Sequence, residues 1–340
     1  MKASNLNEFM DRLALIEKEK SDYVVPSTKL MMTDPRSIAI EGLDSFQLND
    51  VSHVQLASKL DIPKKYYDKI SGVPGLREHN VNTLLSTLDS KYTVRTVNGV
   101  ARAVLSDRYL PVDNFMVLNE VMPVLMGFPG AEIKTSTLTD KRMYMQIVFP
   151  HTAKEIVKGD MVQYGLTLSN SEVGLGAVKV ESTIWRLICA NGMIGKSIVN
   201  RKHVGRQINE NDNMDLFRRE TVQADLKAFT MKLSDIIKYS MQEAEIEALF
   251  SPIREAAGMK LEKPEETVEN ITKRFGLSDL ESQHVLRNML SENNWSKYGV
   301  INGVTNASHI TDNPDRQYDL ERIGSDILDL PRNQWKVLSA

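Results

Sequence analysis

One short segment constrains the fold of this chain more than any other. Residues 93–97 and 100–104 are rich in β-branched and aliphatic side chains and flank Asn98-Gly99. Both turn residues tolerate positive φ, as a two-residue type I′ turn requires. The pattern therefore predicts a β-hairpin, and counting outward from the turn places Arg95 directly opposite Arg102.

Two arginines in opposite positions would repel each other by up to about 1 kcal/mol, so something must compensate. One candidate is an external anion such as a nucleic-acid phosphate. The other is an acidic side chain from elsewhere in the fold, or plain solvation. The sequence leaves both interpretations open.

Arg108 and Tyr109 follow the hairpin closely. A guanidinium and an aromatic ring beside a basic sheet face suit single-stranded nucleic acid, through phosphate pairing and base stacking. The alternative is structural, with Asp107 pairing with Arg108 and Tyr109 packing in the core.

The remaining patterns predict an α+β fold, in which an antiparallel β-sheet built from successive hairpins has helices packed on one face and a mostly helical C-terminal part follows. We expect a helical N-terminal region over 1–80, the sheet core over 81–210 and the helical region over 211–340, which could pack with the core as one domain. Helices are predicted over 5–20, 51–60 and 63–70, after Asp113, and from about 214 to 250, and strands over 132–138, 142–149, 162–169 and 177–189.

Two smaller signals concern the C-terminal part. Ser278 to Glu281 has the form of a capping box, which predicts a helix start. The apolar stripe of the long helix, which includes Phe229 and Leu233, indicates a core face, with a self-association face as the alternative.

Composition restricts the function classes. The net charge is −3, so any anion-binding site must arise from local clustering. A single cysteine, Cys189, excludes an intrachain disulfide and fits a reducing compartment. The first 20 residues lack the apolar run of a signal peptide, and no stretch approaches the ~18 apolar residues that span a bilayer. We therefore expect a cytoplasmic protein that does not contact a membrane.

A second basic cluster consists of Lys196, Arg201, Lys202, His203 and Arg206, with no acidic residue between 196 and 206. Such a cluster could form one wall of an electrostatic groove. A solvated loop is the alternative.

Gly195-Lys196-Ser197 fits a relaxed phosphate-binding loop, in which backbone amides surround phosphates and the lysine reaches the outer ones. Ala190 replaces the leading glycine, however, and the surroundings indicate antiparallel strands. The six histidines are scattered, and none has metal-ligand spacing to another histidine or cysteine.

Several phrases together carry a family resemblance. They are Val94-Arg95-Thr96 with Arg102 to Tyr109, Pro111 and Asp113-Asn114; Gly159-Asp160 with Leu168 to Gly174; Arg186 to Gly192; and Asn302 to Asn306. In this order, over roughly residues 50–310, the chain resembles the phage/plasmid-like family called domain of unknown function 932. The resemblance implies a mobile-element origin and no mechanism, and loosely suggests the single-strand annealing proteins of phages.

The leading hypothesis is a non-enzymatic protein that binds single-stranded nucleic acid, with strand annealing in recombination as a candidate role and homo-oligomers as a candidate assembly. Tyr109 would stack on a base, no metal or cofactor is expected, and phosphates would be contacted by Arg95, Arg102, Arg108, Lys196, Arg201, Lys202 and Arg206. The alternatives are a protein-interaction or host-modulating factor, and a nucleotide-using enzyme built around Gly195-Lys196-Ser197.

Overall fold

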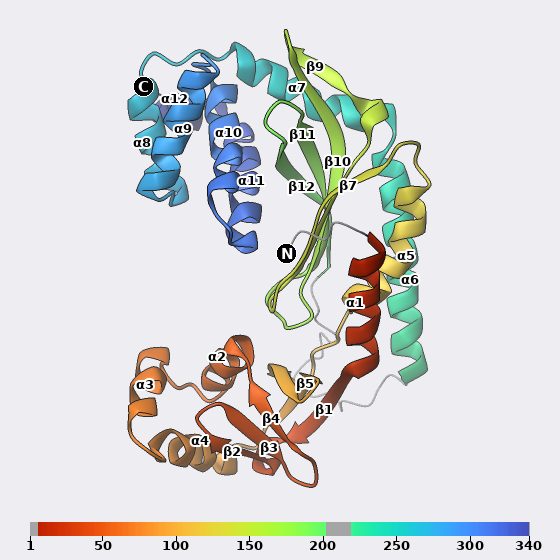
Figure 1. Ribbon diagram of the computed structural model, residues 1–340, viewed down its shortest axis with the longest axis vertical. Coiled ribbons are helices and arrows are strands. Elements are labelled where there is room, and N and C mark those ends of the chain that lie inside the picture. Colours follow the sequence, from red (N-terminus) through yellow and green to blue (C-terminus); the bar gives the residue numbers. More distant parts are fainter. Residues whose placement is uncertain (1–5, 202–218, 340) are drawn as a thin grey trace.

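Two six-stranded β-sheets organise the protein, and helices pack against both (Figure 1). The computed structural model describes residues 6–201 and 219–339. The predicted α+β class is confirmed, with a mostly helical C-terminal part from α6 onward. Within the described residues no helix is long and apolar enough to cross a membrane.

The first sheet has the strand order β1-β5-β6-β4-β3-β2. All its pairs are antiparallel except β4 and β6, which run parallel. Its strands and the helices that pack on it are β1 (Lys20–Pro26), β2 (Leu30–Asp34), β3 (Ser37–Ile40), β4 (Ser45–Leu48), α2 (Asp50–Lys59), α3 (Lys64–Lys69), α4 (Leu76–Thr87), β5 (Lys91–Val97) and β6 (Val100–Ser106). We call residues 20–106 the first unit, because they share a core of their own.

The N-terminal region differs from the prediction. It contains four strands, β1 to β4, that form one sheet with the hairpin strands β5 and β6, so the boundary predicted at residues 80 and 81 falls inside this sheet. The other predicted boundary, at residues 210 and 211, lies outside the described residues. The helix predicted over 5–20 is confirmed as α1 (Leu6–Glu19), and it packs on the second sheet rather than on the first.

The hairpin itself is confirmed, but its predicted register is wrong. Asn98 and Gly99 have φ of 51° and 77°, as the turn requires. Farther out, Arg95 pairs with Ala103 while Thr96 pairs with Ala101, so Arg102 is the extra residue of a β-bulge. A bulge places two residues of one strand opposite one residue of the other. The two arginines are therefore not opposite each other.

The second sheet has the order β12-β11-β10-β8-β7, with β9 paired to β10. Its strands are β7 (Glu132–Leu138), β8 (Met143–Val148), β9 (Lys154–Val157), β10 (Asp160–Asn170), β11 (Val178–Arg186) and β12 (Asn191–Arg201). Strand β12 was not predicted, because its glycines and basic residues are typical of a loop.

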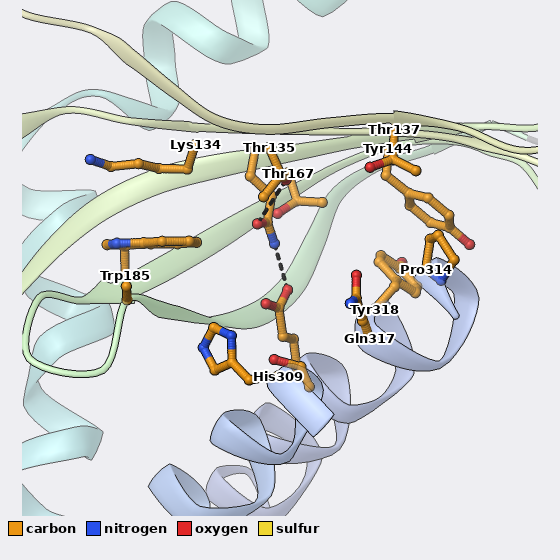
Figure 2. A pocket seen from close by; sticks show the side chains of 14 residues that line it. Lys134, Thr135, Thr137, Tyr144, Thr167, Trp185, His309, Pro314, Gln317 and Tyr318 are labelled. Carbon is orange, nitrogen blue, oxygen red and sulfur yellow. Dashed lines mark hydrogen bonds between the residues drawn. The ribbon is translucent and has the colours of Figure 1, made fainter. Parts of the chain in front are cut away.

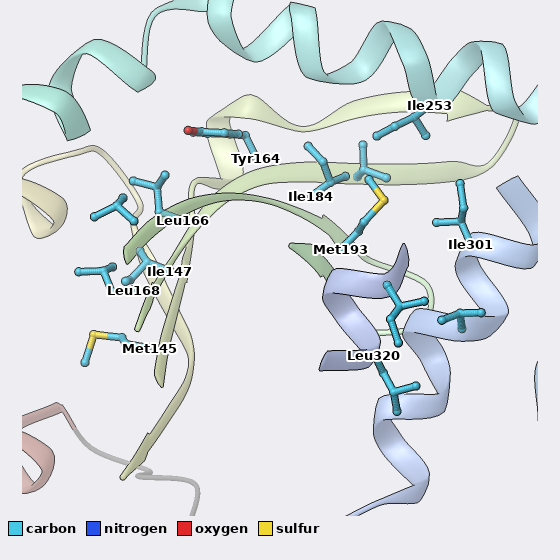
Figure 3. Close-up of a cluster of buried hydrophobic side chains, with 14 of the residues drawn as sticks. Met145, Ile147, Tyr164, Leu166, Leu168, Ile184, Met193, Ile253, Ile301 and Leu320 are labelled. Atoms are coloured by element: carbon cyan, nitrogen blue, oxygen red, sulfur yellow. The ribbon is translucent and has the colours of Figure 1, made fainter. Parts of the chain in front are cut away.

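Alternation along these strands creates two unlike faces. On β8 and β10, residues such as Met145, Ile147, Leu166 and Leu168 belong to the main apolar core (Figure 3). The helices α1, α5 (Asn114–Met126) and α6 (Arg219–Ser240) cover this face (Figure 1). The opposite face carries polar side chains that are nevertheless buried, of which Gln146, Thr167 and Thr183 are examples.

The C-terminal helices lie at one end of the second sheet, where α7 crosses beside β9 and α8 to α11 lie on the side opposite α1, α5 and α6 (Figure 1). They are α7 (Glu243–Gly258), α8 (Pro264–Phe275), α9 (Asp279–Ser291), α10 (Lys297–Asn306), α11 (Pro314–Leu328) and α12 (Arg332–Leu338). The helix predicted to reach residue 250 ends at Ser240, and α7 starts after a short break. The capping box is confirmed, since Ser278 Oγ accepts from the Glu281 amide and Glu281 Oε2 from the Ser278 amide. The stripe on α6, with Phe229 and Leu233, is buried core.

Candidate functional site

Arg95 is buried inside the fold rather than presented to a ligand. Its side chain is 5% exposed. Its guanidinium donates to Asp22 Oδ1 at 2.8 Å, to Asp113 Oδ1 at 2.7 Å and to the backbone carbonyl of Glu172 at 2.8 Å. Burial alone would lower the pKa of Arg95, but Asp113 and Asp22 raise it above its ordinary value. Internal carboxylates therefore occupy the guanidinium of Arg95, for which the sequence predicted a phosphate contact.

Arg102 is compensated in the same way. Its Nη1 lies 3.0 Å from Glu172 Oε2. The other oxygen of Glu172 accepts from the Asn114 amide at 2.7 Å, in the first turn of α5, where negative charge is stabilising. Asp113 is the N-cap residue of this helix, but its side chain makes no capping bond and pairs instead with Arg95 and Lys20. We call Lys20, Asp22, Arg95, Arg102, Asp113 and Glu172 the seam, because they join the first unit to the second sheet.

The two predicted contact residues that follow the hairpin, Arg108 and Tyr109, have different surroundings. Tyr109 packs beside Leu105 and Val173, and its hydroxyl donates to the Ser171 carbonyl at 3.2 Å, so it is a packing residue. Arg108 is exposed. The predicted Lys202 and Arg206 lie outside the described residues.

The phosphate-loop interpretation is wrong. Residues 195–197 lie within β12, which pairs antiparallel with β11. A phosphate-binding loop needs a turn between a strand and a helix N-terminus, so that successive amides converge on one point. The predicted Lys196 and Arg201 belong to the same strand.

A pocket lies between the polar face of the second sheet and the helix α11 (Figure 2). Its volume is about 280 Å³, near the lower end of the range for small-molecule sites. It is lined by Lys134, Thr135, Thr137, Tyr144, Gln146, Thr167, Trp185, Ala190, Ser308, His309, Pro314, Gln317, Tyr318 and Glu321.

The floor of this pocket is a hydrogen-bonded chain of polar side chains, marked by dashed lines in Figure 2. Gln146 Nε2 donates to Glu321 Oε2 at 2.5 Å, and Thr135 Oγ1 donates to Gln146 Oε1 at 3.0 Å. The described residues include no cation that forms a salt bridge with Glu321. Burial raises the pKa of Glu321 to about 8, although the bonds from Gln146 and the Gly192 amide oppose the shift. The carboxyl group is thus mostly protonated at neutral pH.

Aromatic rings form the walls. Figure 2 shows Trp185 and His309 toward one end of the pocket and Tyr144 and Tyr318 toward the other. The two tyrosine rings lie 5.0 Å apart between centroids. Their hydroxyl groups are held by acidic residues, Tyr144 by Asp315 at 2.5 Å and Tyr318 by Glu181.

A lysine lies at the mouth of the pocket. Lys134 is on the edge strand β7 beside the Trp185 ring (Figure 2), its side chain is 28% exposed, and its Nζ lies 2.6 Å from Glu132 Oε2. His309 and Ala190 at the same opening are exposed. Among the described residues no group of acidic, histidine and cysteine side chains has the arrangement of a metal site.

Sequence reasoning missed this pocket. Its residues come from strands and helices almost 190 positions apart, so no short motif joins them. One signal was available on β8, where Tyr144 and Gln146 alternate with Met143, Met145 and Ile147. That alternation would have placed a polar side chain on the face opposite the core.

The comparisons with known proteins bear on the family. The family model for a domain of unknown function, DUF932, matches residues 101–322. No curated protein and no solved structure matches the chain. The matched part runs from β6 into α11 and so includes the second sheet, all the residues that line the pocket and part of the seam. Because the match covers more than half of the chain, the protein belongs to the DUF932 family.

Proposed function

We propose that this protein binds single-stranded nucleic acid and holds one unstacked base in the pocket under α11. The observation that carries the proposal is the combination of an aromatic wall at Trp185, a polar floor at Gln146 and Glu321, and a lysine at the mouth. The proposal keeps the partner expected from the sequence and changes the residues that would contact it.

Each part of the pocket suits one part of a nucleotide. Bases in single strands are free to stack on aromatic rings and to expose their hydrogen-bonding edges. The Trp185 ring offers an apolar surface, while Gln146 and Glu321 offer polar atoms to a base edge. Lys134, at the opening, would contact a phosphate. A base in a duplex has its edge paired and could not enter.

The chain as a whole has a formal charge of −3, so binding must rest on local contacts. A binding site with few phosphate contacts predicts a modest dependence of affinity on salt. Strand annealing, self-association and a mobile-element setting would be further proposals that depend on this binding.

Fluorescence polarisation with labelled 12-nucleotide single strands tests the proposal. We expect affinity to fall as salt rises, because phosphate contacts release counterions. Lys134→Ala should weaken binding to every sequence and reduce the slope of log affinity against log salt by about one. Lys273→Ala is the matched control, since Lys273 is an exposed lysine on α8. Absence of binding at low salt, or equal binding by both variants, would overturn the proposal.

A further inference from the structure

The carboxyl group of Glu321, on the floor of the pocket, differs from the other buried carboxylate beside α11. It lies on α11, is 8% exposed and lines the pocket. Within the described part of the chain it has no basic partner. Glu181 provides a contrast, because that buried carboxylate beneath the same helix lies 2.5 Å from Arg322 Nη1. The fold neutralises Glu181 with an arginine and leaves Glu321 facing a polar amide.

We propose that Glu321 acts in its protonated form as a hydrogen-bond donor to the base held in the pocket. The proposal rests on the proposed function and names the group that would recognise the base edge. A protonated carboxyl group presents one donor beside one acceptor, whereas a carboxylate presents acceptors only. Adenine and cytosine each expose a ring nitrogen acceptor beside an amino donor, so they match the protonated form.

Burial without a counter-charge favours the protonated form. The carboxyl group accepts a hydrogen bond from Gln146, whose amide is held in turn by Thr135, and this bond opposes the effect of burial without reversing it. Removing a carboxylate from water without a counter-charge is costly, and protonation relieves that cost. The pKa near 8 agrees with this geometry.

The other titratable groups that line the pocket are Lys134 on β7, Tyr144 on β8, Tyr318 on α11 and His309 after α10. Burial raises the pKa of both tyrosines above the ordinary value of a phenol. Both phenols therefore stay neutral below pH 9. The variant His309→Gln serves as the control for the histidine.

The test measures binding of 12-nucleotide deoxyadenosine and deoxycytidine strands at pH 6, 7 and 9 and constant ionic strength. The carboxyl group would be about nine-tenths protonated at pH 7 and one-tenth at pH 9, so affinity should fall about tenfold between them. Between pH 6 and pH 7 it should change little. Glu321→Gln keeps a donor beside an acceptor and cannot titrate, so its profile should be flat from pH 6 to pH 9.

Two controls assign the effect. His309→Gln should retain the tenfold fall in affinity between pH 7 and pH 9. If the fall also persists in Glu321→Gln, another group titrates and the proposal is overturned. Infrared spectroscopy of the wild-type protein gives a second measurement that needs no variant to fold. The carbonyl band of a protonated carboxylic acid should disappear as pH rises through about 8. A strand of abasic sites should bind without this pH dependence.

The outcomes separate the two proposals. If wild-type protein binds the strands equally at pH 7 and pH 9, the role of Glu321 is refuted and the proposed function stands. If no strand binds at any pH, the proposed function fails, and this inference fails with it.

Discussion

At the scale of single residues, Arg95 shows how a charge that looks available in the sequence is used inside the fold. Its guanidinium is shared between Asp22 and Asp113, which are separated from it by 73 and 18 positions. A buried charge keeps its ionised form only when partners replace water. The arginine therefore stabilises the fold, and a ligand is not needed to explain it.

Replacing Arg95 by Met should lower the free energy of unfolding by about 3–5 kcal/mol, because two carboxylates lose their buried partner. Urea denaturation followed by circular dichroism measures the change. The control is Arg108→Met, since Arg108 is exposed and such substitutions usually stay within about 0.5 kcal/mol. Equal stability of the two variants would contradict the role assigned to Arg95.

Through Glu321, the stability of the folded protein should depend on pH in the direction opposite to that expected for a salt-bridged acid. Its pKa in the folded state is raised to about 8, so between its unfolded value, about 4.3, and pH 8 the folded protein binds more protons than the unfolded chain. Stability should therefore fall as pH rises through this window, by up to about 1.4 kcal/mol per pH unit from this group. Glu321→Gln should remove that component, which urea titrations at pH 5, 6, 7 and 8 would measure. Parallel curves for both proteins would contradict it.

At the scale of elements, the sequence predicted those turns, helix starts and strands that depend on residues close together in the chain. The turn at Asn98-Gly99, the start of the helix α9 and the strands β8 and β10 follow from turn chemistry, capping and alternation. Register was not predictable, because the bulge at Arg102 depends on carboxylates that approach from other parts of the chain. Strands β2 to β4 are five residues or shorter and gain stability only from their neighbours. The pocket was not predictable either, because the residues that line it come from distant parts of the chain.

Gly99→Ala should destabilise the hairpin, because Gly99 has φ of 77° and a residue with a Cβ atom costs about 1–2 kcal/mol in left-handed backbone. Thermal unfolding would show a lower melting temperature. Gly258→Ala is the control, since Gly258 lies at the end of α7, outside the left-handed region, with open space around its Cα. A drop of equal size in both variants would contradict the argument.

At the scale of the whole molecule, the seam is where two separate cores meet. The first unit, residues 20–106, interrupts the second, since α1 precedes it and α5 follows it, and both pack on the second sheet. Three ion pairs of the seam cross between the units, Arg95 and Lys20 with Asp113 and Arg102 with Glu172. Gln55 adds a hydrogen bond to the Val173 carbonyl at 2.7 Å. These buried polar contacts should make the two units unfold together.

The positions of the tryptophans allow a direct test of this coupling. All three, Trp185, Trp295 and Trp335, lie outside the first unit. Tryptophan fluorescence therefore follows the second unit alone, while far-ultraviolet circular dichroism follows both. In the wild-type protein we expect the two urea transitions to coincide, as in a two-state process.

The double variant Asp113→Asn/Glu172→Gln removes all three of these ion pairs while preserving side-chain size. The circular dichroism transition should then begin at lower urea than the fluorescence transition, because the smaller first unit has lost its attachment to the larger core. Glu269→Gln, on the exposed face of α8, should leave the transitions coincident. If the double variant also unfolds in one coincident step, the coupling lies in the apolar contacts and the covalent connections between the units, and the ion pairs of the seam contribute only to local stability.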